Sequence, residues 1–358
     1  MPCRNEARSV APALQSLLDS DYPSLEIVAV DDRSEDETGA ILDGLAATNP
    51  RLRVLHIADL PAGWLGKVHA CHLGSKSASG ELILFTDADV VFRKDALAAS
   101  ASLLLELGLG HLVVLPHLIA PGFLERGLVA TFALLASGKF RVWELHRPRT
   151  RGFIGIGAFN LVRRGAYVAI GGHSRLALEV VDDVKLGLVL RRSGIPQAAA
   201  FSAGAVCVRW NAGFRKTVGG LIKNAFASTE WRWGVTLAGV LALALLALGP
   251  LVAIATGPLP VRVLGILTSV LAAFLLGAAA RRSAAGSGLE GLAFPLCVLG
   301  LTAAFLGSAV RTTLDGGIEW RGTRYSLSVL RAACVREGSL SIANAVGWSR
   351  TGGSPPGS

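Results

Sequence analysis

Two carboxylates, Asp87 and Asp89, stand one residue apart at the end of the stretch ELILFTDAD (81–89). Carboxylates at the end of a buried strand are costly in free energy unless they bind something positive. Hard divalent cations such as Mg²⁺ or Mn²⁺ prefer oxygen ligands and also bind diphosphate oxygens. An isolated Asp-x-Asp is most often a solvated turn, but the preceding strand favours a site for a metal and a diphosphate here.

A second acidic pair, Asp31 and Asp32, ends the apolar stretch LEIVAVDD (25–32). An acid at this place could accept hydrogen bonds from a nucleobase or a ribose. It could instead cap the helix that we expect from about Asp36, which is a common role for Asp. The two roles are compatible, so both interpretations stay open.

Lys67 ends the segment GWLGK (63–67), which lacks the G-x-x-x-x-G-K-[ST] spacing of a Walker A phosphate loop. A lysine at a helix N-terminus can still meet a diphosphate, assisted by free backbone N–H groups. The alternative is an exposed lysine on a Gly-rich turn. His69 and His72 follow on the same expected helix, and we favour packing over zinc binding for them because no third ligand is near in sequence.

Asp182 and Asp183 are adjacent acids in an apolar context. Repulsion between them raises one pKa toward the range of a general base. Acids that stabilise a helix N-terminus through its dipole are the alternative. Arg209 and Trp210 could hold a phosphate or a lipid headgroup, or could instead be a basic and aromatic pair at a membrane interface.

These residues must be positioned by an α/β domain. Apolar strands at 25–32, 51–57, 81–89 and 111–116 alternate with helices in the first 150 residues. Such alternation indicates a Rossmann-like, mainly parallel sheet covered on both faces. Ligands of such sheets bind at the carboxyl ends of the strands, so we expect both acidic pairs to share one crevice.

The rest of the chain has a different composition. Of the 358 residues, 51% are hydrophobic and only 17% are charged, and the mean hydropathy is +0.50. Residues 234–256, 263–280 and 291–310 carry no charged side chain, and each is near the roughly 20 residues that span a bilayer. We expect a catalytic domain over 1–212, an interfacial amphipathic segment over 213–233, transmembrane helices over 234–310, and a tail over 311–358 that is disordered from about 349.

The formal net charge is +9. With membrane spans present, this excess favours attraction to anionic lipid, and no basic-aromatic motif indicates nucleic acid as a partner. The five cysteines have no paired spacing, which indicates neither a disulfide framework nor a zinc site.

Several segments, in this order, resemble those of membrane-bound family-2 glycosyltransferases with a GT-A fold, especially the hopanoid-associated and carotenoid (diaponeurosporenoate-type) branch. They cover nearly the whole chain and are jointly specific: PCRNE (2–6), VDDRSEDET (30–38), LPAGWLGK (60–67), FTDADV (85–90), GAFNLVRRGAYVAIGGH (157–173), EVVDDVKLG (179–187), VRW (208–210) and WRGTRY (320–325).

The resemblance implies metal-assisted transfer of a sugar from a nucleotide-sugar donor to a lipid-type acceptor, with inversion at the anomeric centre. It also implies a cell-membrane protein whose catalytic domain is cytoplasmic. By this resemblance, the residues that bind the donor would be Glu6, Asp31, Asp32, Lys67 and Asp87, and the ligands of Mg²⁺ or Mn²⁺ would be Asp89 and Asp87. The catalytic acids would be Asp183, as the base that acts on the acceptor, and Asp182. The residues on the acceptor or phosphate side would be His173, Arg209 and Trp210.

The chain departs from that pattern in three places. The strand that normally precedes P-x-R-N-E is missing because the chain begins at Met1, which leads us to expect an incomplete N-terminus. Val206 stands where processive synthases have the Gln of Q-x-x-R-W, which disfavours synthesis of a long polymer. Three spans would also put the Arg-bearing tail opposite the catalytic domain, against the positive-inside tendency, unless one segment is re-entrant or the span count is wrong.

Two alternatives stay open at this point. One is a polyprenyl-phosphate glycosyltransferase. An ionised phosphate acceptor needs no base, however, so the presence of Asp183 favours a hydroxyl or carboxyl acceptor. The other is a degenerate family member that serves as a membrane scaffold, which the retained acids disfavour.

Overall fold

The computed structural model describes residues 1–147, 150–210 and 213–338, and the tail from 349 that we expected to be disordered lies outside them. The strands are β1 (Pro2–Cys3), β2 (Ile27–Asp32), β3 (Leu52–Ile57), β4 (Leu82–Phe85), β5 (Val90–Phe92), β6 (His111–Leu115), β7 (His117–Leu118), β8 (Asn160–Arg163), β9 (Gln197–Phe201), β10 (Val206–Val208), β11 (Gly317–Trp320) and β12 (Thr323–Ser326). The helices are α1 (Val10–Leu18), α2 (Thr38–Thr48), α3 (Gly66–Ser77), α4 (Ala96–Glu106), α5 (Phe123–Phe140), α6 (Arg164–Ala169), α7 (Asp182–Arg192), α8 (Phe214–Asn224), α9 (Trp233–Thr256), α10 (Leu259–Ala284), α11 (Phe294–Leu314) and α12 (Leu327–Ala333).

The strands of the N-terminal half form a mixed α/β domain. β1, β2 and β3 pair in parallel, and β6 pairs in parallel with β9. β8 lies between β4 and β6 and runs antiparallel to both. Strands β2, β3, β4 and β6 were predicted because their apolar runs are continuous. Strand β8 was not predicted, since it is only four residues long and follows a Gly-rich stretch.

Two cores hold the helices to the two sides of the sheet. One joins α1 and α4 to the strands through side chains such as Leu14, Leu104 and Leu112. The other joins α3, α6 and α7 through Val68, Val162 and Leu186. Tyr325 and Leu330 of the C-terminal tail belong to this second core.

The strand position that we expected to be empty is filled over two residues. Pro2 and Cys3 lie beside Val30 and Asp31 of β2. The amino group of Met1 donates to the Val28 carbonyl at 2.9 Å. Residues 1–3 thus satisfy backbone groups of β2 that would otherwise lack partners.

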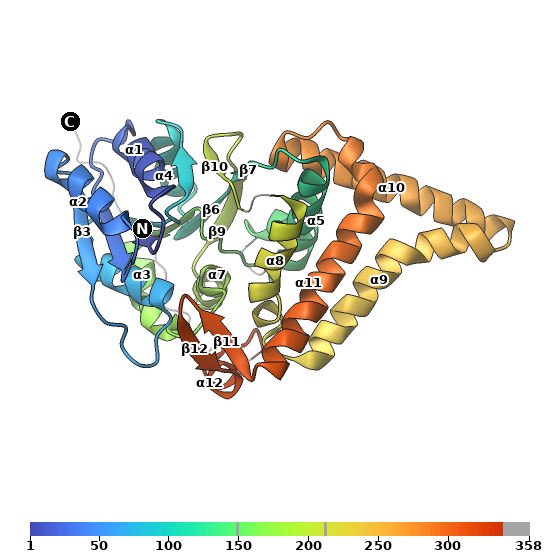
Figure 1. Cartoon of the computed structure of the whole chain (residues 1–358). Helices are drawn as coiled ribbons and strands as arrows, with labels where there is room; N and C mark the ends of the chain where they lie inside the picture. Colours follow the sequence, from blue (N-terminus) through green and yellow to red (C-terminus); the bar gives the residue numbers. More distant parts are fainter. Residues whose placement is uncertain (148–149, 211–212, 339–358) are drawn as a thin grey trace.

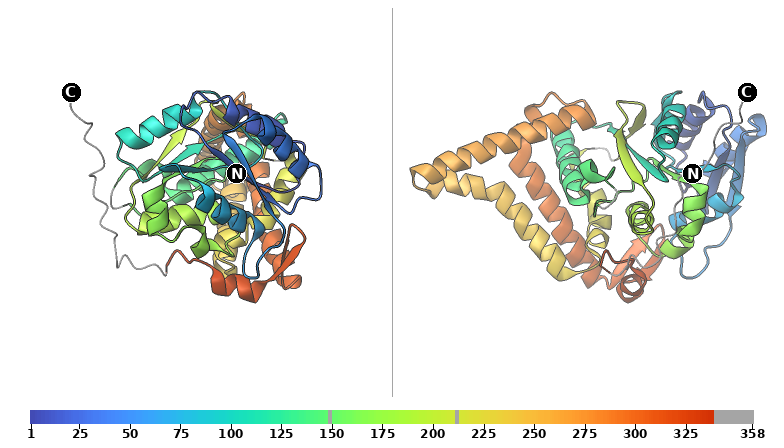
Figure 2. Two further views of the ribbon diagram at one scale, coloured as in Figure 1. Left: turned by 90° about the vertical axis from the view of Figure 1, so that its left-hand side faces the viewer. Right: turned by 180° about the vertical axis from the view of Figure 1, so that it is seen from behind.

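Three helices in the C-terminal half, α9, α10 and α11, are long and apolar enough to cross a membrane by length and composition. Helices α9 and α10 extend beyond the charge-free segments expected there, and α11 begins at Phe294, inside its segment, and ends four residues beyond it. In Figures 1 and 2, α9 and α10 project away from the α/β domain and meet at a tip, while α11 runs across the base of this hairpin. We call α9 and α10 with their connecting turn the apolar hairpin. The amphipathic segment expected at 213–233 contains α8, which packs on α11.

The chain after α11 returns to the α/β domain, as Figure 1 shows for β11, β12 and α12. The Tyr325 hydroxyl donates to the Trp64 carbonyl at 2.9 Å, and Arg321 pairs with Glu6 at 3.2 Å. These contacts do not fit three spans, and they favour the alternatives kept open from the sequence, a re-entrant segment or a different span count. Helix α11 packs along α5, α8 and α9.

Candidate active site

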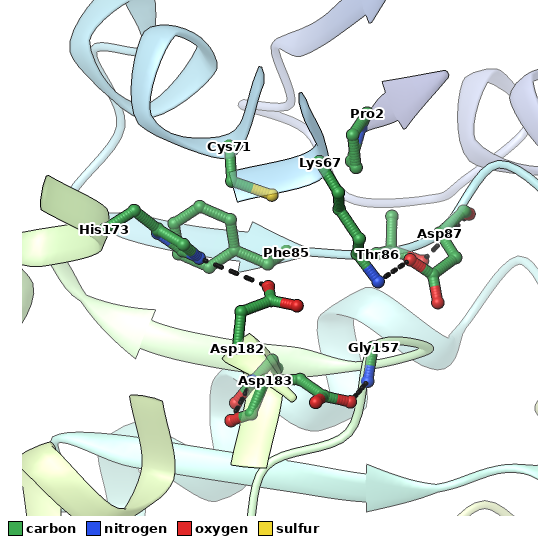
Figure 3. Close-up of a pocket in the computed structure, with 11 residues that line it drawn as sticks. Pro2, Lys67, Cys71, Phe85, Thr86, Asp87, Gly157, His173, Asp182 and Asp183 are labelled. Carbon is green, nitrogen blue, oxygen red and sulfur yellow. Dashed lines mark hydrogen bonds and ion pairs between the residues drawn. The ribbon is translucent and has the colours of Figure 1, made fainter. Parts of the chain in front are cut away.

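A small pocket opens where the carboxyl end of β4 meets the N-termini of α3 and α7. The side chains that enter it come from segments far apart in the sequence, as Figure 3 shows. Those with a charge or a ring nitrogen are Lys67, Asp87, His173, Asp182 and Asp183. All five were candidate residues from the sequence, and the fold brings them together.

Lys67 lies at the first turn of α3 and points toward Asp87, with Nζ 2.5 Å from the Asp87 Oδ1. Loss of water in the pocket on its own lowers the pKa of this ammonium. The nearby carboxylates of Asp87, Asp182 and Asp183 outweigh that effect and hold the pKa of Lys67 well above its usual value. The lysine is therefore a permanent cation surrounded by acids, the charge that a diphosphate would meet.

Asp183 is held by two backbone N–H groups. Gly157 donates to Oδ2 at 2.7 Å, and the N–H of Val184 donates to Oδ1 at 2.8 Å. Burial nevertheless raises the pKa of Asp183, against the attraction of Lys67 and these hydrogen bonds. A carboxylate that is fixed in place and has a raised pKa is suited to accept a proton.

The Gly-rich stretch 152–157 makes this arrangement possible. A Cβ on Gly155 would lie 1.7 Å from the Asp183 carbonyl oxygen, and one on Gly157 would lie 2.4 Å from Asp87 Oδ2. Only a residue without a side chain lets this loop pass between the start of α7 and the end of β4. Gly157 begins the family-like segment GAFNLVRRGAYVAIGGH (157–173), but no role had been predicted for it or for Gly155.

Asp182 faces the interior of the domain rather than Gly157. Its Oδ2 is 3.8 Å from Nε2 of His173, and both side chains are buried. Burial raises the pKa of Asp182 to about 7, opposed by Lys67 and reinforced by Asp183. Burial also lowers the pKa of His173 to about 3, so this histidine is neutral.

Tyr167 completes that side of the site and was not found from the sequence. Its hydroxyl lies 2.8 Å from Nδ1 of His173 and 3.0 Å from Oγ of Ser75, and it accepts the backbone N–H of His173 at 2.9 Å. These contacts fix the His173 ring behind Asp182. A tyrosine in an apolar helix carries no sequence signal for such a role.

Asp87 lines the pocket, whereas Asp89, two residues further along the chain, does not line it. Burial raises the pKa of Asp89 to about 6, with further contributions from Asp87 and Glu6. An excess of negative charge at one place fits a hard divalent cation, because such a cation would relieve the repulsion. Cys71, His173 and Asp182 could also surround an ion, since their ligand atoms lie within 4.8 Å of one another. Burial raises the pKa of Cys71 to about 12, so without an ion beside it this thiol is protonated.

The acids expected near the nucleoside do not line the pocket but flank it. Asp31 accepts the N–H of Ser34 at 3.2 Å and lies 3.0 Å from Nδ1 of His56. Asp32 pairs with Arg33 at 2.8 Å. Asp31 thus stabilises the turn after β2 and does not cap α2, which begins at Thr38 with no side-chain cap.

Glu6 contacts the C-terminal tail through Arg321. Arg321 also donates to the Arg4 carbonyl at 2.8 Å, so the tail reaches the expected nucleoside side of the site. In the sequence, Arg321 stood out only as part of the family-like segment WRGTRY, and no place in the site was predicted for it.

Arg209 and Trp210 lie after β10, away from the pocket. The Trp210 ring contacts Phe132 of α5, with ring centroids 4.9 Å apart. The His69 ring and the His72 ring both contact the Trp64 ring, which agrees with the packing role favoured for them.

Comparisons with known proteins agree with this geometry. Residues 1–171 match the family described as Glycosyl transferase family 2. The 4,4'-diaponeurosporenoate glycosyltransferases of two Staphylococcus aureus strains, MRSA252 and bovine RF122 / ET3-1, are each 27% identical to this chain, over 92% of its length and 88% of theirs.

Among solved structures, the mannosyltransferase PcManGT of Pyrobaculum calidifontis, in complex with GDP-Man and Mn²⁺, superposes with a TM-score of 0.58 at 20% identity. The match covers 88% of this chain and 86% of that one, and at this identity it shows the fold alone. That fold is GT-A, whose enzymes commonly use divalent cations. The chain therefore has a GT-A fold, its residues 1–171 match glycosyl transferase family 2, and over nearly its whole length it is similar to curated glycosyltransferases.

Proposed function

We propose that this chain transfers a sugar from a nucleotide-sugar donor to a lipid-type acceptor, with inversion and with the help of Mg²⁺ or Mn²⁺, at the cytoplasmic face of the cell membrane. The observation that carries the proposal is the pocket in which one cation and three carboxylates meet beside the Gly-rich loop. The names of the relatives and the apolar hairpin support a lipid as acceptor.

On the donor side, Lys67 would contact the diphosphate while Asp87 and Asp89 would hold the divalent cation. Such a cation neutralises the charge that the nucleoside diphosphate gains as it leaves. Glu6, Asp31 and Asp32 would lie on the nucleoside side. Lys67 is already fixed against Asp87, so little side-chain entropy has to be lost when the donor binds.

On the acceptor side, Asp183 would remove the proton of the acceptor as its oxygen bonds to the anomeric carbon. The bond between that carbon and the diphosphate oxygen breaks, and its electron pair leaves with the nucleoside diphosphate. Attack from the face opposite the leaving group inverts the anomeric centre. The hydrogen bonds from Gly157 and Val184 support this role because they fix the carboxylate. Asp182 and His173 would support it from behind, and Arg209 and Trp210 would lie on the acceptor side.

The placement at the membrane rests on charge and hydropathy. Arg232 precedes α9, and Arg281 and Arg282 end α10, so basic side chains gather at the end of the apolar hairpin next to the α/β domain. Basic residues next to membrane helices favour the cytoplasmic side. This supports a multi-pass protein whose catalytic domain is cytoplasmic.

The test is a transfer assay in membranes with a panel of nucleotide sugars, a total lipid extract and Mg²⁺ or Mn²⁺. We expect activity with one donor, loss of activity on chelation, and its recovery when the cation is restored. Asp183→Asn and Asp89→Ala should both abolish transfer. Asp21→Asn is the matched control, because Asp21 is exposed and remote from the pocket.

Identification of the glycosylated lipid separates the acceptor classes. A glycosyl ester or a glycoside supports the carboxyl or hydroxyl acceptor, whereas a phosphodiester product shows a polyprenyl phosphate. Silence with every donor and with lipid extract, from a folded protein, would show that the chain is a scaffold.

A further inference from the structure

We infer that the chain crosses the bilayer twice, through α9 and α10, and that α11 lies along the membrane surface as the platform of the catalytic domain. The inference rests on the proposed membrane placement and revises the three crossings that length and hydropathy alone suggest. In this arrangement, the lipid bilayer covers the exposed apolar hairpin.

Both ends of the apolar hairpin are fixed to the same side of the molecule. At the start of α9, the indole N–H of Trp233 donates to Oγ1 of Thr313 at 3.1 Å. At the end of α10, the Arg282 guanidinium lies over the Phe201 ring of β9, 4.4 Å from its centroid. The tip, near Gly257, is the part that points away from the domain in Figures 1 and 2. A chain that leaves and returns to the same side crosses an even number of times.

The tail provides an independent argument. Besides the contacts of Arg321 and Tyr325, Lys185 of α7 donates to the Val335 carbonyl at 2.5 Å, and Arg331 donates to the Trp231 carbonyl at 3.2 Å. The chain that follows α11 is thus on the catalytic side. Because α10 also ends on that side, α11 starts and finishes on one side and cannot cross.

The exposed surfaces of α9 and α11 also differ as the inference requires. Apolar side chains are exposed on every side of α9, in which the buried residues are only Thr236 and Ala247. In α11, by contrast, Cys297, Leu301 and Ser308 are among the buried side chains, at spacings that mark one helical face. Helix α11 packs against α5, α8 and α9, and Phe214 of α8 lies 3.1 Å from a Cβ built on Gly300.

The helix lengths fit the bilayer. At 1.5 Å per residue, α9 and α10 are roughly 36 and 39 Å long and α11 is roughly 32 Å long. If α11 is the base of a triangle whose sides are α9 and α10, the tip stands about 34 Å above it, close to the ~30 Å of a hydrocarbon core. Arg262, the one charged residue between 233 and 280, lies near the tip, where it would reach the far interface.

The test is the labelling of single cysteines by a membrane-impermeant maleimide, in spheroplasts and in inside-out vesicles, on the full-length protein. The background carries Cys207→Ser and Cys334→Ser, since the other native cysteines are buried. Gly44→Cys reports the catalytic domain and Gly338→Cys reports the tail, because a Cβ at either glycine meets open space. Leu259→Cys and Thr256→Cys both report the tip, and either one suffices if the other fails to accumulate.

We expect the tip cysteines to be labelled only in spheroplasts, and Gly44→Cys and Gly338→Cys only in inside-out vesicles. Leu289 lies just before α11 and Leu314 is its last residue, and both are exposed. Leu289→Cys and Leu314→Cys should therefore be labelled like Gly44→Cys. Labelling of Gly338→Cys and Gly44→Cys from opposite sides would show an odd number of crossings and overturn the inference. So would labelling of the tip from the catalytic side, which would show a hairpin that does not reach across.

The outcome is separable from that of the transfer assay. The labelling pattern needs no donor, acceptor or metal, so a silent enzyme with the expected pattern refutes only the proposed activity. An active enzyme with Gly338→Cys on the far side refutes only the two-crossing arrangement.

Discussion

At the scale of single residues, the proposed chemistry depends on the position of the Asp183 carboxylate. Its two carboxylate oxygens accept backbone N–H groups from Gly157 and Val184, so the side chain is held without a charged partner in direct contact. A base held in this way is ready for an acceptor proton, and its geometry does not depend on the acceptor being present.

Removal of that base should slow the chemical step and leave donor binding intact. We expect Asp183→Asn to lower kcat by about 10²–10⁴-fold, the usual contribution of a general base. Asn keeps one oxygen that accepts hydrogen bonds but cannot take a proton. Steady-state kinetics with separate measurement of nucleotide binding check this, with Asp21→Asn as control. A large loss of donor affinity at unchanged kcat would place Asp183 in donor binding instead.

The raised carboxyl pKa values set the direction of the pH dependence. A base works when deprotonated, so raising its pKa makes activity fall at a higher pH on acidification than for an ordinary Asp. Asp182→Asn removes a negative charge beside Asp183 and therefore lowers the pKa of Asp183. We expect the acid limb of kcat/KM in this variant to move to lower pH, and a limb that stays in place or moves upward would contradict the coupling.

At the scale of elements, the sharpest constraint is the loop before β8, which passes between the start of α7 and the end of β4. We expect Gly157→Ala to raise the donor KM at least tenfold, because the added methyl group would meet both Asp87 Oδ2 and Lys67 Nζ. Gly165→Ala is the matched control, since a Cβ there meets open space. Donor titrations of the two variants make the comparison, and equal KM values would show that the loop can shift at no cost.

The elements also show what could be predicted from the sequence. The carboxyl ends of parallel strands meet at one edge, which predicts that the acids after β2 and β4 lie near one another, and the family-like segments add Lys67 and Asp183 to the same site. The contacts of Tyr167 and Arg321 could not be predicted, because they depend on how α6 and the β11–β12 hairpin pack rather than on residue type or spacing. Whether α11 spans could not be decided from hydropathy, because hydropathy measures apolar length, and a helix that packs along a domain can be as apolar as one that spans.

At the scale of the whole molecule, the tail ties the C-terminal half to the catalytic half. Removal of the Tyr325 hydroxyl leaves the Trp64 carbonyl without that donor and should cost about 1 kcal/mol, a usual value for one hydrogen bond. We expect Tyr325→Phe to release the tail more often, seen as faster proteolysis after residue 314 in detergent. Ser328→Ala, on the exposed side of α12, is the control and should cleave like the unaltered protein.

The pairing of Arg321 with Glu6 joins residues 315 positions apart. During synthesis the N-terminal half leaves the ribosome long before Arg321 exists, and domains generally fold in that order. The side of the site proposed to hold the nucleoside therefore cannot be completed until α9, α10 and α11 have been made and the tail has returned. A nascent or truncated chain would carry the proposed catalytic acids but lack this contact, so under the proposed membrane placement the donor site is completed only after delivery to the bilayer.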